Sequence, residues 1–137
     1  MRAESGPADS GPVGDAGFDG SLPRSFLRPA LHIALLDGAW HGYELLEYVH
    51  RVGLSSVDLS GIYRTLRAME HDRVVASEWE ASGSGPPRRV YELTDAGLQS
   101  AESYLRAVAT ARRHLDDLLA VYLTPSEQAV GVNGVSS

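Results

Sequence analysis

Between residues 24 and 94, the spacing of apolar residues changes in a definite order. Apolar residues first recur every three or four positions, the period of an amphipathic α-helix. Three such sets follow one another: Leu27, Leu31, Ala34 and Leu35, then Tyr43, Leu45, Leu46 and Val49, then Leu59, Ile62, Leu66 and Met69. The period then falls to two, as in β-strands, at Val75, Ser77 and Trp79 and again at Tyr91 and Leu93. The pattern predicts three helices with these apolar faces buried, followed by a β-hairpin.

Residues with strong conformational preferences mark the ends of these elements. Asp37-Gly38 ends the first helix, Gly53 ends the second, and Asp58 is a good N-cap for the third. Residues 81–87, rich in glycine and proline, form the turn between the two strands. Three helices followed by a hairpin predict a winged helix-turn-helix, mainly α with a small β-hairpin.

The segment 95–123, which follows the N-cap Thr94, has the pattern of a long helix with a heptad seam. The seam positions alternate steps of three and four residues and are apolar except at Arg112: Leu98, Ala101, Leu105, Val108, Arg112, Leu115, Leu119 and Tyr122. A lone helix gains nothing from such a seam, so we expect these residues to form the interface of a homodimer. The alternative is that the helix packs on its own domain. The two interpretations are compatible if the first turns of the helix pack on their own domain and the remaining turns pack on the other subunit.

The two ends of the chain differ in composition from the middle. Residues 1–23 contain five glycines and three prolines with few apolar side chains, and residues 124–137 are similar in character. Such segments bury too little surface to offset their ordering entropy. We expect a disordered tail over 1–23, a DNA-binding winged domain over 24–94, a dimerisation helix over 95–123 and a second disordered tail over 124–137.

The net charge of −6 at pH 7 argues against a nonspecific coat for nucleic acid, which is normally basic. Residues 24–94, however, hold eight arginines against nine carboxylates, so a locally basic surface fits within them. The chain has no cysteine, which excludes disulfides and thiolate metal sites. No apolar run is long enough to span a bilayer, and no secretory signal is visible. We expect a cytoplasmic protein with no membrane partner.

Arginines mark the surface expected to bind double-stranded DNA. On a helical wheel, Ser60, Gly61, Arg64, Arg67 and His71 point away from the apolar face of the third helix, with Tyr63 and Glu70 at the boundary. Arginine binds guanine edges and phosphates through paired hydrogen bonds. At the hairpin tip, two prolines precede two further arginines. The predicted DNA-binding residues are Ser60, Gly61, Tyr63, Arg64, Arg67, Arg88 and Arg89.

Other chemistry finds little support in the sequence. His41 and Glu44, like Glu47 and His50, have a spacing that permits metal binding, but no HExxH-type pattern accompanies them. Capping of a helix explains His41 better, and we expect no metal and no cofactor. No nucleophile elbow or phosphate-binding glycine loop is present, so an enzyme is not expected.

Aromatic residues raise the question of a small-molecule effector. Trp40, Trp79 and Tyr104, together with Tyr122, are candidates for lining a pocket between subunits that takes a flat aromatic ligand. The alternative is that these rings belong to the core.

Four motifs in order resemble the PadR family of bacterial transcriptional regulators. Residues 41–45 (HGYEL) are similar to its second-helix motif and residues 62–70 (IYRTLRAME) to its recognition helix. Trp79-Glu80 and residues 85–97 (GPPRRVYELTDAG) resemble its wing and the start of its last helix. The single C-terminal helix is similar to that of the short-tailed branch. The resemblance implies a homodimeric repressor that binds an inverted repeat and is released by a small molecule.

Two positions depart from the family pattern. Residues 58–63 lack the proline that usually begins the recognition helix. Arg73 stands where glycine is common, and there it would adopt a strained left-handed conformation unless the turn differs. The acidic balance leaves one alternative open, a dimeric winged-helix adaptor that binds proteins and does not read DNA.

Overall fold

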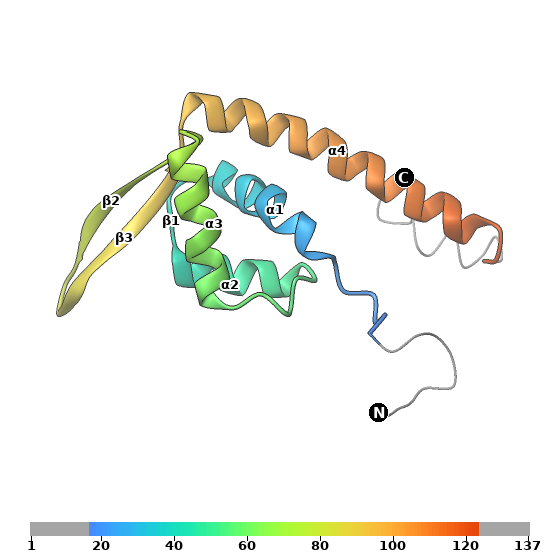
Figure 1. Cartoon of the computed structure of the whole chain (residues 1–137), viewed down its shortest axis with the longest axis horizontal. Coiled ribbons are helices and arrows are strands. Elements are labelled where there is room, and N and C mark those ends of the chain that lie inside the picture. The colour runs from blue at the N-terminus through green and yellow to red at the C-terminus, as the bar shows by residue number, and fades with distance from the viewer. Residues whose placement is uncertain (1–16, 124–137) are drawn as a thin grey trace.

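The computed structural model describes residues 17–123, and in it three helices pack together beside a projecting hairpin (Figure 1). These helices are α1 (Leu27–Ala34), α2 (Gly42–Arg51) and α3 (Leu59–His71), with short 3-10 turns η2 (Arg24–Phe26) and η3 (Leu35–Asp37) around α1. A short strand β1 (Trp40–His41) precedes α2, and β2 (Val75–Ser82) and β3 (Gly85–Leu93) form the hairpin. The long helix α4 (Asp95–Ala120) runs along α1 and continues beyond it (Figure 1). The predicted winged helix-turn-helix is confirmed.

The core lies where α1, α2 and α3 meet. Its buried side chains include most of the predicted helical faces: Leu27, Leu31, Ala34, Leu35, Leu45, Val49, Ile62, Leu66 and Met69. Tyr43 was expected among them but is 65% exposed. It lies two residues from the buried Leu45, which places it about 200° away around the helix. Tyr43 therefore faces away from the core.

The sheet has three antiparallel strands in the order β1-β3-β2. In the hairpin, Val75 pairs with Leu93 and Ser77 with Tyr91. The strands run further than predicted, so the turn is confined to Gly83-Ser84 instead of residues 81–87. Prolines 86 and 87 fit within β3 because there β3 pairs only with β2. The strand β1 was not predicted, since two residues carry no period.

The N-terminal boundary of the folded domain lies earlier than expected. Leu22 packs on the core, and its N–H donates to the carbonyl oxygen of Gly53 at 2.8 Å. Leu22 therefore belongs to the winged domain and not to a disordered tail. The expectation of disorder for residues 1–16 and 124–137 lies outside the described residues.

The end of α3 has the left-handed residue that the sequence suggested. Arg73 has φ of 64°, and its N–H donates to Glu70 O at 3.0 Å. The next N–H, of Val74, donates to Met69 O at 3.0 Å. These two bonds form a Schellman motif, which ends the helix at the cost of a left-handed residue. The chain has arginine instead of glycine at this position, so it forms the same turn but carries the steric strain of a side chain at positive φ.

The first turn of α4 lies directly against the turn that ends α3. The Thr94 hydroxyl donates to Arg73 O at 2.8 Å and accepts from Gly97 N–H at 3.1 Å. A Cβ at Gly97 would lie only 1.9 Å from Val74 O, so the approach requires glycine. Further along α4, Ala101 is fully buried. Ala101 is therefore a contact within its own subunit, and its expected place in a dimer interface is wrong.

His32 of α1 is buried beside α4. Its Nδ1 donates to Arg28 O at 2.9 Å, and its ring lies edge-on to Tyr104 at 4.8 Å. Within residues 17–123 its Nε2 has no hydrogen-bond partner. Burial lowers the pKa of His32 below the ordinary value of 6.5, which the bond to Arg28 O opposes and the charge of Arg28 reinforces. Burial therefore favours the neutral form of His32 in the folded protein.

Among the helices that the structure describes, none combines the length and apolar character that crossing a membrane requires.

Replacing Arg73 with glycine is expected to stabilise the protein. Glycine adopts positive φ without the steric cost that arginine carries. Glycine also gives the unfolded chain more conformational entropy, which offsets part of this gain, so the free energy of unfolding should rise by about 0.5–1 kcal/mol. Urea unfolding measures it. Ala68→Gly in the same helix is the control, with an expected loss of about 1 kcal/mol. A lower stability in Arg73→Gly would contradict this account of the turn.

The buried His32 predicts a specific pH dependence of stability. Because its folded pKa is depressed, the unfolded chain takes up a proton first as pH falls below 6.5, so stability present above that pH is lost below it. The slope of unfolding free energy against pH from about 7.5 to about 5.5 should be smaller in His32→Leu than in the wild type. The exposed His114→Leu is the control and keeps the wild-type slope. Equal slopes in all three proteins would refute the prediction.

Candidate nucleic-acid interface

The outer face of α3 presents free arginines. Asp58 caps the helix by accepting from Gly61 N–H at 2.8 Å. Ser60, Arg64 and Arg67 are exposed as expected, and Tyr63 is half-buried at the boundary. In the part of the chain that the structure describes, neither arginine forms an ion pair. Two unneutralised guanidinium groups one turn apart suit an anionic partner.

Gly61 does not have the open position that the wheel assigned to it. It is buried, and a Cβ there would lie 3.2 Å from Asp58 Oδ1 and 3.3 Å from Arg24 Nη2. Its backbone is covered, so direct approach of DNA to Gly61 is not available in this arrangement. The exposed Arg24 beside it was missed, because only the fold brings it to this end of α3.

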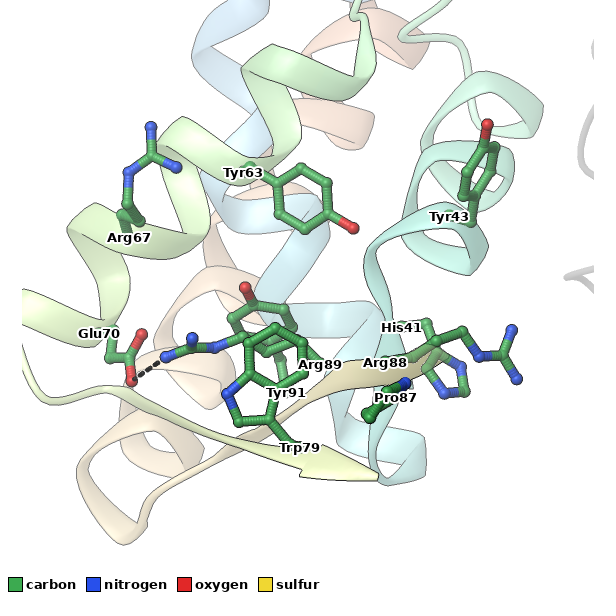
Figure 2. A pocket seen from close by; sticks show the side chains of 10 residues that line it. All are labelled: His41, Tyr43, Tyr63, Arg67, Glu70, Trp79, Pro87, Arg88, Arg89 and Tyr91. Carbon is green, nitrogen blue, oxygen red and sulfur yellow. Dashed lines mark ion pairs between the residues drawn. The ribbon is translucent and has the colours of Figure 1, made fainter. Parts of the chain in front are cut away.

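The two hairpin arginines have different surroundings. Both lie within β3 and not at the tip, since Arg88 pairs with Glu80 and Arg89 with Trp79. Figure 2 shows their side chains pointing in opposite directions, Arg89 toward Glu70 and Arg88 to the side of His41. Arg88 is exposed, and no ion pair holds it among the described residues.

Arg89 connects the hairpin to α3. Its Nε donates to Ser77 Oγ at 3.0 Å, and its Nη2 lies 3.8 Å from Glu70 Oε2. The Ser77 hydroxyl donates to the same Glu70 oxygen at 2.8 Å. The guanidinium also lies over the Trp79 ring, 5.2 Å from its centroid. Arg89 is thus held within the chain, unlike the other predicted DNA-binding arginines.

A groove of about 610 Å³ separates α3 from the hairpin (Figure 2). Its aromatic lining consists of Tyr43, Tyr63, Trp79 and Tyr91, and its guanidinium groups come from Arg67, Arg88 and Arg89. The Tyr63 ring lies against the start of α2, where a Cβ at Gly42 would be 2.5 Å from its hydroxyl oxygen. Burial raises the pKa of Tyr91, so its hydroxyl stays protonated at neutral pH. The groove thus combines apolar walls with positive charge.

His41 caps α2 at one end of this groove. Glu44 Oε1 accepts from His41 N–H at 2.7 Å and lies 2.8 Å from His41 Nδ1, while His41 Nε2 is 3.3 Å from Glu80 Oε1. The bond from His41 N–H is the main reason that the pKa of Glu44 is lowered, and the His41 ring and Arg88 add to it. This geometry supports the capping interpretation. Among the described residues, no group of three His, Asp or Glu side chains is placed to hold a metal ion.

The aromatic residues proposed for an effector pocket lie apart in one chain. Trp40 packs edge-on to Tyr48 at 5.8 Å, Tyr104 packs on His32, and Trp79 lines the groove beside α3. Tyr122 is 83% exposed near the end of α4. One subunit does not assemble them into a pocket, and a pocket between subunits stays a prediction.

The heptad seam of α4 is divided between its own domain and solvent. Besides the buried Ala101, Val108 is half-buried and lines a shallow hollow of about 200 Å³ with Phe26 and Pro29. The remaining seam positions are exposed: Leu98, Leu105, Arg112, Leu115, Leu119 and Tyr122. Leu118 and Val121, which the seam omits, are exposed beside them.

The sequence model of the transcriptional regulator PadR-like family matches residues 31–103, just over half of the chain. The chain belongs to this family. The match begins within α1 and ends in the first third of α4, so it includes α3 and the wing of this PadR-like protein. The distal, exposed part of α4 lies outside it.

Solved structures share this PadR fold. A PadR-like transcriptional regulator from Bacillus cereus is 25% identical, with a TM-score of 0.63 over 71% of this chain and 94% of that one. A PadR family regulator from Clostridium difficile is 20% identical, with a TM-score of 0.61 over 69% and 99%. Bacillus subtilis PadR, solved in complex with operator DNA, is 24% identical, with a TM-score of 0.52 over 58% of this chain and 46% of that one. No curated protein matches the chain in sequence.

Proposed function

We propose that this PadR-family chain is a DNA-binding transcriptional regulator that acts as a homodimeric repressor of a palindromic operator. The observation that carries the proposal is the pair Arg64 and Arg67, exposed and without ion pairs among the described residues, on the outer face of α3. The chain as a whole is acidic, yet the guanidinium groups of Arg64 and Arg67 are not neutralised and lie next to a projecting hairpin. Duplex DNA, an anionic partner with adjacent major and minor grooves, fits this arrangement.

The proposed docking places α3 in the major groove and the hairpin in the adjacent minor groove. In this pose Arg64 and Arg67 reach base edges or phosphates, and Ser60 and Tyr63 offer hydroxyl groups to the backbone. Arg88 contacts a phosphate. The common fold with Bacillus subtilis PadR, whose structure contains operator DNA, supports this arrangement.

The exposed seam of α4 supports a second subunit. Leu115 and Leu119 in the last turns of α4, and Tyr122 just after the helix, are exposed. The end of α4 extends past α1 (Figure 1). A contiguous exposed apolar stripe marks an interaction surface. Pairing of two such helices gives two-fold symmetry, and half-sites about one helical turn apart follow from it. Release of DNA by a small molecule bound between the subunits stays a prediction.

One observation favours a second candidate, a dimeric adaptor that binds proteins. The outer face of the hairpin carries Glu78, Glu80 and Glu92, which would repel phosphates. An adaptor, however, has no need for free arginines on α3, so DNA binding accounts for more of the surface.

Binding to the DNA upstream of the protein's own gene tests the proposal. We expect the wild type to prefer this duplex over a scrambled one at about 150 mM salt, measured by fluorescence anisotropy with competitor DNA. Arg64→Ala or Arg67→Ala should cost about 1–3 kcal/mol if the side chain reads a base. Arg88→Ala should weaken both duplexes similarly and reduce the salt slope by about 1.

Arg113→Ala is the matched control, since it removes the same charge from the outer face of α4 and should change neither affinity nor slope. Wild-type affinity in all the α3 and β3 variants would reject these residue roles. If the wild type binds no duplex even at low salt, the adaptor is the better account.

The dimer is tested by charging the exposed seam. Leu119→Glu should convert the protein to a monomer at micromolar concentration, because a carboxylate would be buried without a partner at the interface. Sedimentation equilibrium compares the mass with the 14.7 kDa of one chain. The control Ser103→Glu adds the same charge at an exposed position of α4 off the seam. A dimeric Leu119→Glu protein, or a monomeric wild type, would rule out this interface.

A further inference from the structure

The groove between α3 and the hairpin has a geometric relation to the proposed docking, on which this inference rests. When a helix lies in the major groove and a hairpin lies in the adjacent minor groove, one DNA strand separates the two grooves. That strand therefore lies between the helix and the hairpin. That strand has to pass between α3 and the hairpin, where the groove of about 610 Å³ lies. We propose that this groove holds the sugar–phosphate backbone of that strand and that Trp79 packs against its deoxyribose.

Trp79 is held in position but remains open to the groove. It is 64% exposed, although tryptophan is a large apolar residue. Arg89 lies over the indole at 5.2 Å and is itself fixed by Ser77 at 3.0 Å. Figure 2 shows the ring within the groove beside Tyr91, on the side of the sheet that faces α3. A fixed aromatic ring loses little conformational freedom when a partner covers it.

The charges in the groove favour a phosphate. Glu70 is a carboxylate in its lining, and alone it would repel an anion. It accepts from Ser77 Oγ at 2.8 Å and lies 3.8 Å from Arg89 Nη2, so Arg89 offsets its charge. Arg67 and Arg88, which have no ion pair within residues 17–123, are then available to the phosphates. The two adjacent arginines of β3 thus have different roles. Arg88 contacts a phosphate, and Arg89 offsets the charge of Glu70.

A contact between Trp79 and deoxyribose has a different signature from the other contacts. Sugars are the same at every base pair, so the contact adds affinity without sequence preference. It also releases no counterion, so it leaves the salt dependence unchanged. An arginine–phosphate contact also lacks sequence preference, but it changes the salt dependence. A base contact leaves the salt dependence unchanged, but it depends on the sequence.

The affinities of Trp79→Ala for the operator and for a scrambled duplex test the proposal. We expect both to fall by the same factor, about tenfold, with the slope of log affinity against log salt unchanged. Trp79→Phe keeps a ring and should recover most of the loss. Because Trp79 is exposed, both variants should fold, which circular dichroism and the unchanged oligomeric mass verify.

A fluorescence measurement reports on the same contact without removing it. The chain has two tryptophans, so Trp40→Phe leaves Trp79 as its only tryptophan, which excitation near the red edge of the absorption selects over tyrosine. Its emission should shift to shorter wavelength and change in intensity when the operator saturates the protein. In the reciprocal variant Trp79→Phe, the emission of Trp40 should stay constant.

Three results would overturn the proposal while leaving DNA binding intact. They are wild-type affinity in Trp79→Ala, a loss confined to the operator, and unchanged Trp79 emission at saturation. A reduced salt slope in Trp79→Ala would likewise assign the effect to a displaced arginine instead of the ring. Absence of binding by the wild type to any duplex would remove the proposed function and this inference together.

Discussion

The arrangement of the whole molecule depends on how closely α4 approaches Val74. The N–H of Val74 closes α3 by donating to Met69 O at 3.0 Å, and its carbonyl accepts from Thr94 N–H at 3.1 Å. The same carbonyl lies where a side chain at Gly97 would begin, 1.9 Å from a Cβ. One residue therefore joins the end of α3, the start of the hairpin and the first turn of α4. Since backbone atoms make all these contacts, the three elements cannot rotate independently without breaking them.

A second connection fixes the distance between the hairpin and α3. A long two-stranded hairpin is flexible by itself, because only its base packs on the core. Here Arg89 and Ser77 of the hairpin both contact Glu70 of α3. Both ends of this ionic contact, Glu70 and Arg89, belong to the lining of the groove. Its width is thus set before any partner binds, which lowers the ordering cost of binding.

The sequence predicted those features that depend on local periodicity and backbone preference. Most of the helical faces and the caps Asp58 and Thr94 follow from neighbours in the chain. The left-handed Arg73 was indicated by the glycine that the PadR family commonly has there. The errors concern positions decided by distant segments. A wheel cannot show that Arg24 covers Gly61, and alternation in a strand cannot show what lies opposite Trp79. In residues 81–87, composition indicated a loop, whereas cross-strand pairing extends the strands through it.

The register of the hairpin also explains how an acidic chain can present a basic groove. Paired residues in an antiparallel sheet share a face, so Trp79 and Arg89 lie together toward α3. Glu80 and Arg88 start from the other face, but the side chain of Arg88 still lines the groove at its His41 end. Glu78 and Glu92 extend that other side, so a polyanion is repelled from the back of the hairpin and is favoured where Arg67, Arg88 and Arg89 line the groove. The negative charge therefore restricts the direction of approach. A shift of the register by one residue would exchange the two faces and place the carboxylates in the groove, so the pairing that begins at Val75 and Leu93 decides which ligand the groove can hold.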